Sequence, residues 1–183
     1  MATGAVTATV AISASSLGLP VFSPDRTAAL IYTGGSGVTK VAVVDMTTGL
    51  QAGSTVEIAG SSLGTPTFGS DSSHVLVYTG GTGATKATVI DLETGATTAT
   101  VAVSASSLGK PLLSPDGTHA VIYTGGTGAT KVAVVDMTTG LQAGSTVEIA
   151  GSSLGTPTFD SDNSHVVVLT GGTGVTKVTI LPL

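Results

Sequence analysis

The sequence repeats one unit of about 46 residues four times, and this period restricts the folds that the chain can adopt. Tyr32, Tyr78, Tyr123 and Leu169 mark the same place in successive units and are 46, 45 and 46 residues apart. Each unit reads as an apolar run, a glycine-rich turn, a second apolar run and an Asp-x-x-x-Gly turn. Self-similarity at this period is typical of repeat architectures. Nearly all of the 183 residues therefore belong to one array of four units.

Each unit is predicted to form short β-strands and no helix. The runs are rich in β-branched residues and are bounded by Gly, Asp, Ser and Pro, as strands are. No apolar stripe at helical spacing persists over ten residues. By position in the unit, the predicted strands are 20–22, 66–68, 111–113 and 157–159 (first), 28–33, 74–79, 119–124 and 165–170 (second), 40–45, 86–91, 131–136 and 177–181 (third), and 54–59, 97–103 and 145–150 (fourth).

The fourth unit has no fourth strand of its own, and the N-terminus carries a segment that matches it. Residues 5–13 resemble residues 96–104 closely. A blade split between the termini is the closure device of a β-propeller, which leaves no long unpaired edge. We therefore predict an all-β propeller with four four-stranded blades. The predicted blades are about 19–60, about 65–104, about 110–151, and about 156–183 completed by the N-terminal strand 5–13.

Two segments of the third unit carry a resemblance to a known family. Ser114–Thr124, followed by Val132–Gly140, resembles the YVTN-type β-propeller repeat of bacterial and archaeal surface proteins. It is also similar to the propeller repeats of large mycobacterial secreted proteins. The resemblance covers all four units and rests on structural motifs. It implies a propeller fold and an extracellular or cell-surface parent protein, and it implies no particular ligand.

A second period of 91 residues overlies the first. Residues 39–68 are identical to residues 130–159, so a pair of blades was the unit of amplification. Such identity indicates either recent duplication or deliberate design. Met1–Gly4 aligns with Leu92–Gly95 inside a repeat. We therefore expect the chain to be an excised or engineered part of a longer array.

The scarcity of bulky side chains bears on how many blades close the ring. The chain has three Phe, three Tyr and no Trp. Four blades in one ring would splay steeply, and close packing would then require large side chains in the outer wedges. Small side chains suit blades that lie nearly parallel. We predict that two chains form an eight-bladed ring, each N-terminal strand completing the partner's split blade, with a four-bladed monomer as the alternative.

Composition argues against several classes of partner. The net charge is −5 and the six Lys and Arg are spread along the chain, whereas nucleic-acid binding needs clustered positive charge. No run approaches the roughly 20 apolar residues of a membrane helix, and no signal peptide is visible. The absence of cysteine excludes disulfides and thiol chemistry. We expect the partner to be a second copy of the chain, with no nucleic acid and no membrane.

Three recurring motifs could carry chemistry, and each has a structural interpretation that we favour. Gly80–Lys86 lacks the Gly-Lys-Ser/Thr order and the following helix of a phosphate loop, so we expect a hairpin turn. One repeat position carries a histidine, with an aspartate three residues earlier, but the first unit has Ala28 there. We expect these aspartates to hydrogen-bond in their turns rather than to converge on a metal. The two sets are His74, His119 and His165, and Asp71, Asp116 and Asp162.

The remaining charged positions are also predicted to be structural. Asp45, Asp91 and Asp136 close the third strands, where each carboxylate can accept turn N–H groups and the following glycine supplies positive φ. Glu57 and Glu148 on the outer strands are expected to be solvated and to discourage edge-to-edge association.

The function predicted from the sequence is that of a non-catalytic scaffold. Catalysis usually needs one asymmetric set of residues, whereas the two nearly identical halves of this chain contain every candidate catalytic residue at least twice. We predict no catalytic residues, no cofactor and no metal. Binding through face loops is the expected activity, motivated by the Ser-Ser-Leu-Gly loops at 61–64, 106–109 and 152–155. The alternative is a purely structural fragment or designed protein without a ligand.

Overall fold

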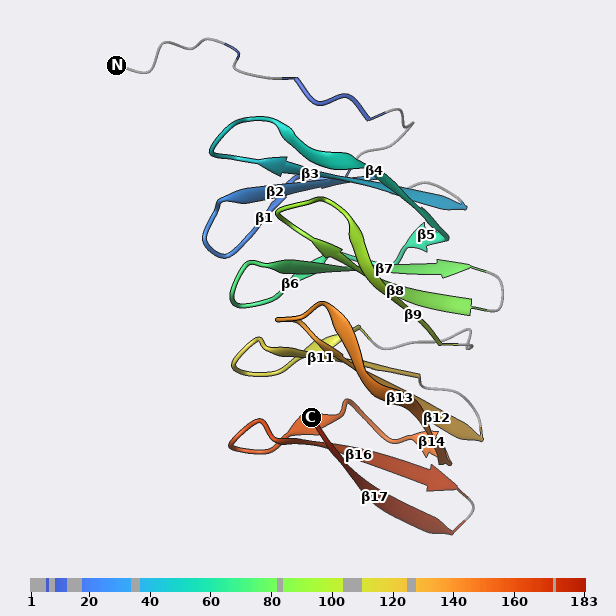
Figure 1. The fold of residues 1–183 in the computed structure, drawn as a ribbon. Helices are drawn as coiled ribbons and strands as arrows, with labels where there is room; N and C mark the ends of the chain where they lie inside the picture. The colour runs from blue at the N-terminus through green and yellow to red at the C-terminus, as the bar shows by residue number, and fades with distance from the viewer. Residues whose placement is uncertain are drawn as a thin grey trace.

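The computed structural model describes residues 6, 9–12, 18–33, 37–81, 84–103, 110–124, 128–172 and 174–183. All regular structure in these residues is β, and it forms four antiparallel sheets. The sheets stack face to face in a row that begins near the N-terminus and ends with the C-terminus (Figure 1). The described residues contain no helix long and apolar enough to cross a membrane.

Each sheet corresponds to one sequence unit and is called a blade. The first blade has the order β1 (Val21–Phe22), β2 (Ala28–Tyr32), β3 (Val38–Asp45), β4 (Gln51–Ala59). The second contains β6 (Thr67–Phe68), β7 (His74–Gly81), β8 (Ala84–Asp91) and β9 (Thr97–Val103), with β5 (Ser61–Ser62) also paired to β7. The third has β10 (Leu112–Leu113), β11 (His119–Tyr123), β12 (Ala129–Asp136) and β13 (Leu141–Ala150). The fourth contains β14 (Ser152–Ser153), β15 (Thr158–Phe159), β16 (His165–Gly172) and β17 (Val175–Pro182).

The outer strands of the first and third blades are longer than the sequence predicted. β4 begins at Gln51 rather than at residue 54, and β13 begins at Leu141 rather than at residue 145. In both blades the pairing with the preceding strand shifts register once, between Val41 and Val43 and between Val132 and Val134. Across this shift the outer strand has two more residues than its partner, so pairing continues on both sides of a bulge, which alternation alone does not predict.

Two of the predicted Ser-Ser-Leu-Gly loops contain strand residues. Ser61–Ser62 pairs with β7 and Ser152–Ser153 pairs with β16, so each segment joins the following blade before that blade's own first strand begins. Serine has no strong strand propensity. These pairings arise because the chain passes alongside an existing edge as it crosses to the next blade. The loop at 106–109 lies outside the described residues.

The ends of the row are open within one chain. β17 pairs with β16, and no described strand pairs with its other side. Val6 and residues 9–12 have no assigned strand, and the segment 9–12 lies at the opposite end of the row, beside the first blade (Figure 1). The rest of the predicted strand 5–13 lies outside the described residues. The described residues of one chain thus form an open row of blades.

Three apolar clusters lie between successive blades and hold the row together. Each cluster combines the facing sides of two sheets, because side chains alternate along every strand. The cluster between the second and third blades contains Leu76, Tyr78, Ala87, Val89, Val101, Val103, Ala120, Ile122, Ala133, Val135 and Met137. The clusters on either side of it repeat this arrangement.

Small residues on the middle strands let the blades approach closely. Ala87, Ala120 and Ala133 are almost completely buried in the same cluster. Gly95 shows how near the blades come: a Cβ at this position would lie 2.0 Å from the carbonyl oxygen of Ala52 in the first blade. Only glycine fits there, since its φ of 67° also lies in the left-handed region.

Candidate functional site at the aspartate-turn edge

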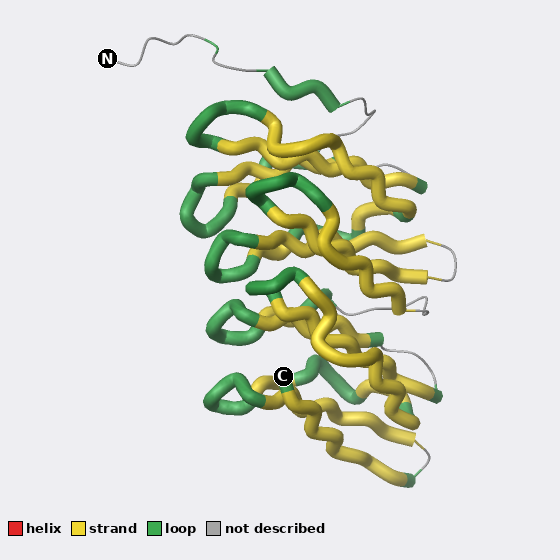
Figure 2. Tube along the Cα trace, viewed as in Figure 1, coloured by secondary structure: helices red, strands yellow, loops and turns green. Residues whose placement is uncertain are grey.

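The two aspartate turns of each of the first three blades, and the one aspartate turn of the fourth, lie at the same edge of the row. The first turn precedes the second strand and the other follows the third, and these strands pair antiparallel so that their ends meet. In the second blade His74 lies opposite Asp91, and in the first Ala28 lies opposite Asp45. Figure 2 shows these turns as green loops along one side of the stack. The edge therefore brings together the carboxylates of the aspartate turns.

The turn after the third strand is built on an aspartate, as predicted. Asp45 accepts hydrogen bonds from the backbone N–H groups of Thr47 (2.7 Å) and Thr48 (3.3 Å), and from the Thr48 hydroxyl (2.8 Å). These bonds, led by the Thr48 hydroxyl, lower the pKa of Asp45. Gly49 ends the turn with a φ of 73°. The turns at Asp91 and Asp136 repeat this pattern, so all three carboxylates are structural.

The turn before the second strand also depends on carboxylate hydrogen bonds. Asp116 accepts from the Ser114 hydroxyl (2.6 Å), the Thr118 backbone N–H (3.1 Å) and the Thr118 hydroxyl (2.9 Å). These bonds, the Ser114 contact first, lower the pKa of Asp116 from 3.8 to about 2. Asp25 has the same partners in the first blade, and its pKa is likewise lowered to about 2, chiefly by the Thr27 backbone N–H.

These turns predict a loss of stability in acid. The folded pKa of Asp25 and Asp116 is about 2, below the ordinary 3.8. Their contribution to stability is therefore complete above pH 3.8 and is lost as the pH falls through about 2. We expect the thermal midpoint measured by circular dichroism to fall across this window. Asp116→Asn should show a shallower fall than the wild type, and parallel curves for the two proteins would contradict this account.

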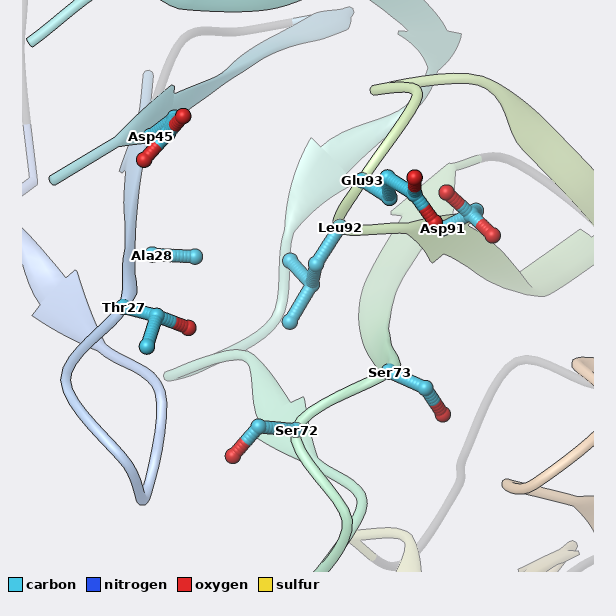
Figure 3. Close-up of a pocket in the computed structure, with 8 residues that line it drawn as sticks. All are labelled: Thr27, Ala28, Asp45, Ser72, Ser73, Asp91, Leu92 and Glu93. Atoms are coloured by element: carbon cyan, nitrogen blue, oxygen red, sulfur yellow. The ribbon is translucent and has the colours of Figure 1, made fainter. Parts of the chain in front are cut away.

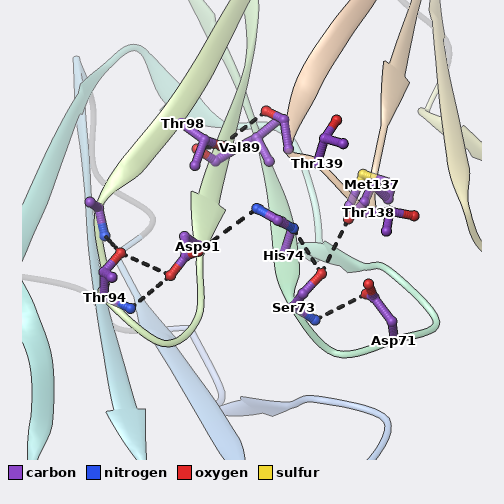
Figure 4. Close-up of polar contacts among 12 residues, drawn as sticks. Asp71, Ser73, His74, Val89, Asp91, Thr94, Thr98, Met137, Thr138 and Thr139 are labelled. Atoms are coloured by element: carbon purple, nitrogen blue, oxygen red, sulfur yellow. Dashed lines mark hydrogen bonds and ion pairs between the residues drawn. The ribbon is translucent and has the colours of Figure 1, made fainter.

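His74 illustrates how the repeated histidine packs. Its ring is almost completely buried, and Nδ1 forms a hydrogen bond of 2.8 Å with the Ser73 hydroxyl. Nε2 lies 3.9 Å from Asp91 (Figure 4). The ring reaches the turn of the third blade, because a Cβ on Gly140 would lie 2.5 Å from its Cδ2. Met137, fully buried, contributes its carbonyl oxygen 3.5 Å from the Ser73 hydroxyl. His74 therefore fills the edge between the second and third blades.

A pocket opens at the corresponding place between the first and second blades. Its volume is about 330 Å³. Thr27, Ala28 and Asp45 form one wall, and Leu92 and Glu93 with neighbouring residues form the other (Figure 3). Ala28 takes the repeat position of His74, and its methyl group leaves this space open. The sequence marked Ala28 as an exception but did not predict a pocket.

The three histidines do not form a common site. Each belongs to a different blade, and each Nδ1 hydrogen-bonds the hydroxyl of the residue before it, namely Ser73, Thr118 or Ser164. The aspartates three residues earlier, Asp71, Asp116 and Asp162, accept backbone N–H groups in their turns, as predicted.

Asp160 is a residue that the sequence did not single out. Asp160, Asp162 and His165 bring one ligand atom each within 4.8 Å of one another, the one such group among the described residues. Asp160 is already paired with His165 Nδ1 at 2.8 Å and accepts its backbone N–H at 3.0 Å. Burial raises the pKa of Asp160, but the hydrogen bonds from His165 and Ser164 outweigh it and lower the pKa to about 2. The pair therefore serves as a turn brace.

The other candidates have structural roles where they are described. Gly81 pairs with Ala84 at the end of the β7–β8 hairpin, and residues 82–83 between them lie outside the described residues. Glu57 and Glu148 are exposed, and each pairs across strands with a lysine, at 2.8 Å to Lys40 and 3.7 Å to Lys131. Exposed pairs of this kind contribute about 0–1 kcal/mol.

Comparison with known proteins identifies the fold. The sequence matches no protein-family model and no curated protein. The structure is similar to the Dos1 propeller (TM-score 0.53, 13% identity), covering 89% of this chain and 40% of that one. It is similar to a putative 6-phosphogluconolactonase from Bacteroides fragilis (0.52, 15%) and to the β-propeller domain of the Trilobed protease from Pyrococcus furiosus (0.51, 13%). For both, the match covers 91% of this chain and 55% of the other. The chain thus has a β-propeller fold and spans about half the length of these structures.

Proposed function

We propose that the protein is a non-catalytic propeller scaffold, two copies of which close an eight-bladed ring of YVTN-type blades. Its face loops would be the surface that it offers to ligands or other proteins. The proposal rests on one observation. Apolar side chains on the outer faces of the two end blades are exposed, whereas side chains at the same repeat positions inside the row are buried.

The free face of the fourth blade has the composition of a blade interface. Val178 and Ile180 of β17 are 63% and 61% exposed. The residues at the same repeat positions in the second blade, Ala87 and Val89, are 0% exposed because the third blade covers them. Exposed apolar side chains gathered on one sheet face are typical of an interaction surface. A further blade is the partner that matches this face.

The first blade offers the complementary face. Met46 is 47% exposed, whereas Met137 at the same repeat position is fully buried against the second blade. Ile31 is half-buried, and its counterpart Ile122 is completely buried. Ala29, Ala42 and Val44 on the same face are at most 9% exposed even in the single chain, so the exposed part of this face is at Met46 and Ile31. The fourth blade of one chain could therefore pack on the first blade of its partner through the same kind of contact. Two such joints would complete a closed two-fold ring.

The N-terminal segment supplies the strand that the joint needs. Val10 and Ile12 are half-buried and alternate with exposed Thr9 and Ala11, the periodicity of a strand with one covered face. In the second blade Val101 pairs with Ala87 and Val103 with Thr85. By the 91-residue repeat, the equivalent pairs in the proposed joint would be Val10 with Val178 and Ile12 with Thr176. The proposed joint thus has a defined register.

The small residues between neighbouring blades also support a ring of more than four blades. Alanine-rich contacts between neighbouring blades are consistent with blades that diverge little, as more than four per ring requires.

Light scattering after size exclusion tests the proposal. We expect a mass of twice 17.6 kDa. Oxidised Val10→Cys/Val178→Cys protein, whose only cysteines are the two introduced, should run as a covalent dimer on a non-reducing gel. The single-cysteine variants are the matched controls. If the mass is that of one chain and the disulfide forms within a single chain, the result would instead support four blades closing on themselves.

A further inference from the structure

We propose that the pocket between the first and second blades is a binding site for an imidazolium ring, such as free imidazole or the histidine side chain of a partner. The inference does not depend on how the ring closes, because both walls of the pocket belong to one chain. It rests on a comparison between equivalent positions of the repeat.

The next interface shows which chemical group the walls accept. There, His74 lies between Asp91 of its own blade and the Met137 turn of the following blade, and it is almost completely buried. In the pocket, Asp45 occupies the place of Asp91 and Leu92 the place of Met137. The walls are therefore repeated, while the imidazole is replaced by the methyl group of Ala28. A ligand that restores the missing ring would restore the packing.

The shape of the pocket is compatible with such a ligand. Its volume of about 330 Å³ lies at the lower end of the range for small-molecule sites, roughly 300–1,000 Å³. Leu92 is 6% exposed and presents an apolar surface to one side, while Thr27 and Ala28 border the other (Figure 3). At the equivalent place in the next interface, the planar ring of His74 occupies the space between the walls.

The negative charge of the pocket favours the protonated form of the ring over the neutral form. Asp45, Asp91 and Glu93 all line the pocket. Hydrogen bonds within its turn lower the pKa of Asp45. Burial raises the pKa of Asp91, but the hydrogen bonds from Thr94 and the nearby His74 outweigh it and lower the pKa overall. The Asp45 and Asp91 carboxylates therefore stay ionised below their ordinary titration range, so a cation is favoured over a neutral ligand. Imidazole groups become protonated near pH 6.5. Binding should therefore be stronger at pH 6 than at pH 9, where the ring is neutral and the pocket remains negative.

An imidazole titration followed by amide NMR tests the proposal. In the wild type at pH 6, we expect saturable shifts for Thr27, Ala28, Ser73 and Glu93, with a dissociation constant in the millimolar range because the ligand is small. Ala28→His, which supplies the ring covalently, should abolish these shifts. Shifts that never saturate, or that persist unchanged in Ala28→His, would overturn the proposal.

The reverse substitution is the matched control. His74→Ala should create a second site between the second and third blades, lower the thermal midpoint, and gain imidazole-dependent shifts around Met137. Added imidazole should restore part of the lost midpoint by binding the folded state, whereas the same concentration of sodium chloride should not. Equal responses to imidazole and salt would contradict the inference. If His74→Ala does not fold, the comparison of wild type with Ala28→His decides alone.

Discussion

We expect lysine at both Val178 and Ile180 to convert the proposed two-chain ring, with a mass of twice 17.6 kDa, into single chains. Both side chains are exposed in the free chain, so the substitutions should leave the individual blades folded. In the proposed ring, the partner's first blade would cover them. Two ammonium groups would then be buried in an apolar joint without partners, at a cost of several kcal/mol each. Light scattering and circular dichroism together measure the loss of the dimer and the retention of the fold.

Two lysines on outer strands provide the charge-matched control. Ser54 and Ser145 are exposed on β4 and β13, outside the apolar face of β17. Ser54→Lys/Ser145→Lys adds the same charge and should keep the wild-type mass. If Val178→Lys/Ile180→Lys also remains dimeric, the joint does not use this face, and the proposed ring geometry is wrong.

Ile122→Ala will destabilise the protein by about 2–5 kcal/mol, the usual cost of truncating a fully buried isoleucine. Ile122 is 0% exposed in the cluster between the second and third blades, where the backbones are held close by Ala87 and Ala133. The surrounding strands are fixed on both sides by hydrogen-bonded neighbours, so they cannot collapse into the cavity. Urea unfolding followed by circular dichroism should show a lower midpoint for Ile122→Ala at every protein concentration.

Ile31→Ala is the matched control, since Ile31 occupies the same repeat position on the free face of the first blade. Ile31 is only half-buried within one chain, so its truncation should cost less in dilute protein. The cost should rise at concentrations where the ring forms and the partner's fourth blade covers it. Equal losses for Ile31→Ala and Ile122→Ala at all concentrations would show that the two positions are not distinguished by a joint between chains.

The aspartate turns show how far local sequence can predict a site. Asp45 and Gly49 are four residues apart, and the hydrogen bonds that they need come from the backbone between them. Asp116 and Thr118 are likewise close in sequence. Everything required for these turns lies within a few residues. The roles of these carboxylates are therefore predictable from the order of the amino acids alone.

The pocket and the Asp160–His165 brace could not be predicted in the same way. The pocket requires Ala28 on one blade to face Leu92 on the next, and this depends on the spacing and angle between two sheets. Asp160 replaces a serine or glycine at its repeat position, so the alignment of repeats revealed a difference but no contact. The same limitation applied to Ser61–Ser62 and Ser152–Ser153, whose strand character comes only from a neighbouring edge.

The amino-acid sequence by itself determined the period, the four β-sheets and the aspartate turns, because hydrophobic alternation and turn chemistry act over a few residues. The tertiary structure decided which faces are covered. It buried Ala87 and Val89 while leaving Val178 and Ile180 exposed, although these residues lie at equivalent repeat positions. It also filled one blade edge with His74 and opened the next at Ala28. The physical reason is that burial depends on the neighbouring blade, and repeat identity specifies a blade without specifying what packs against it.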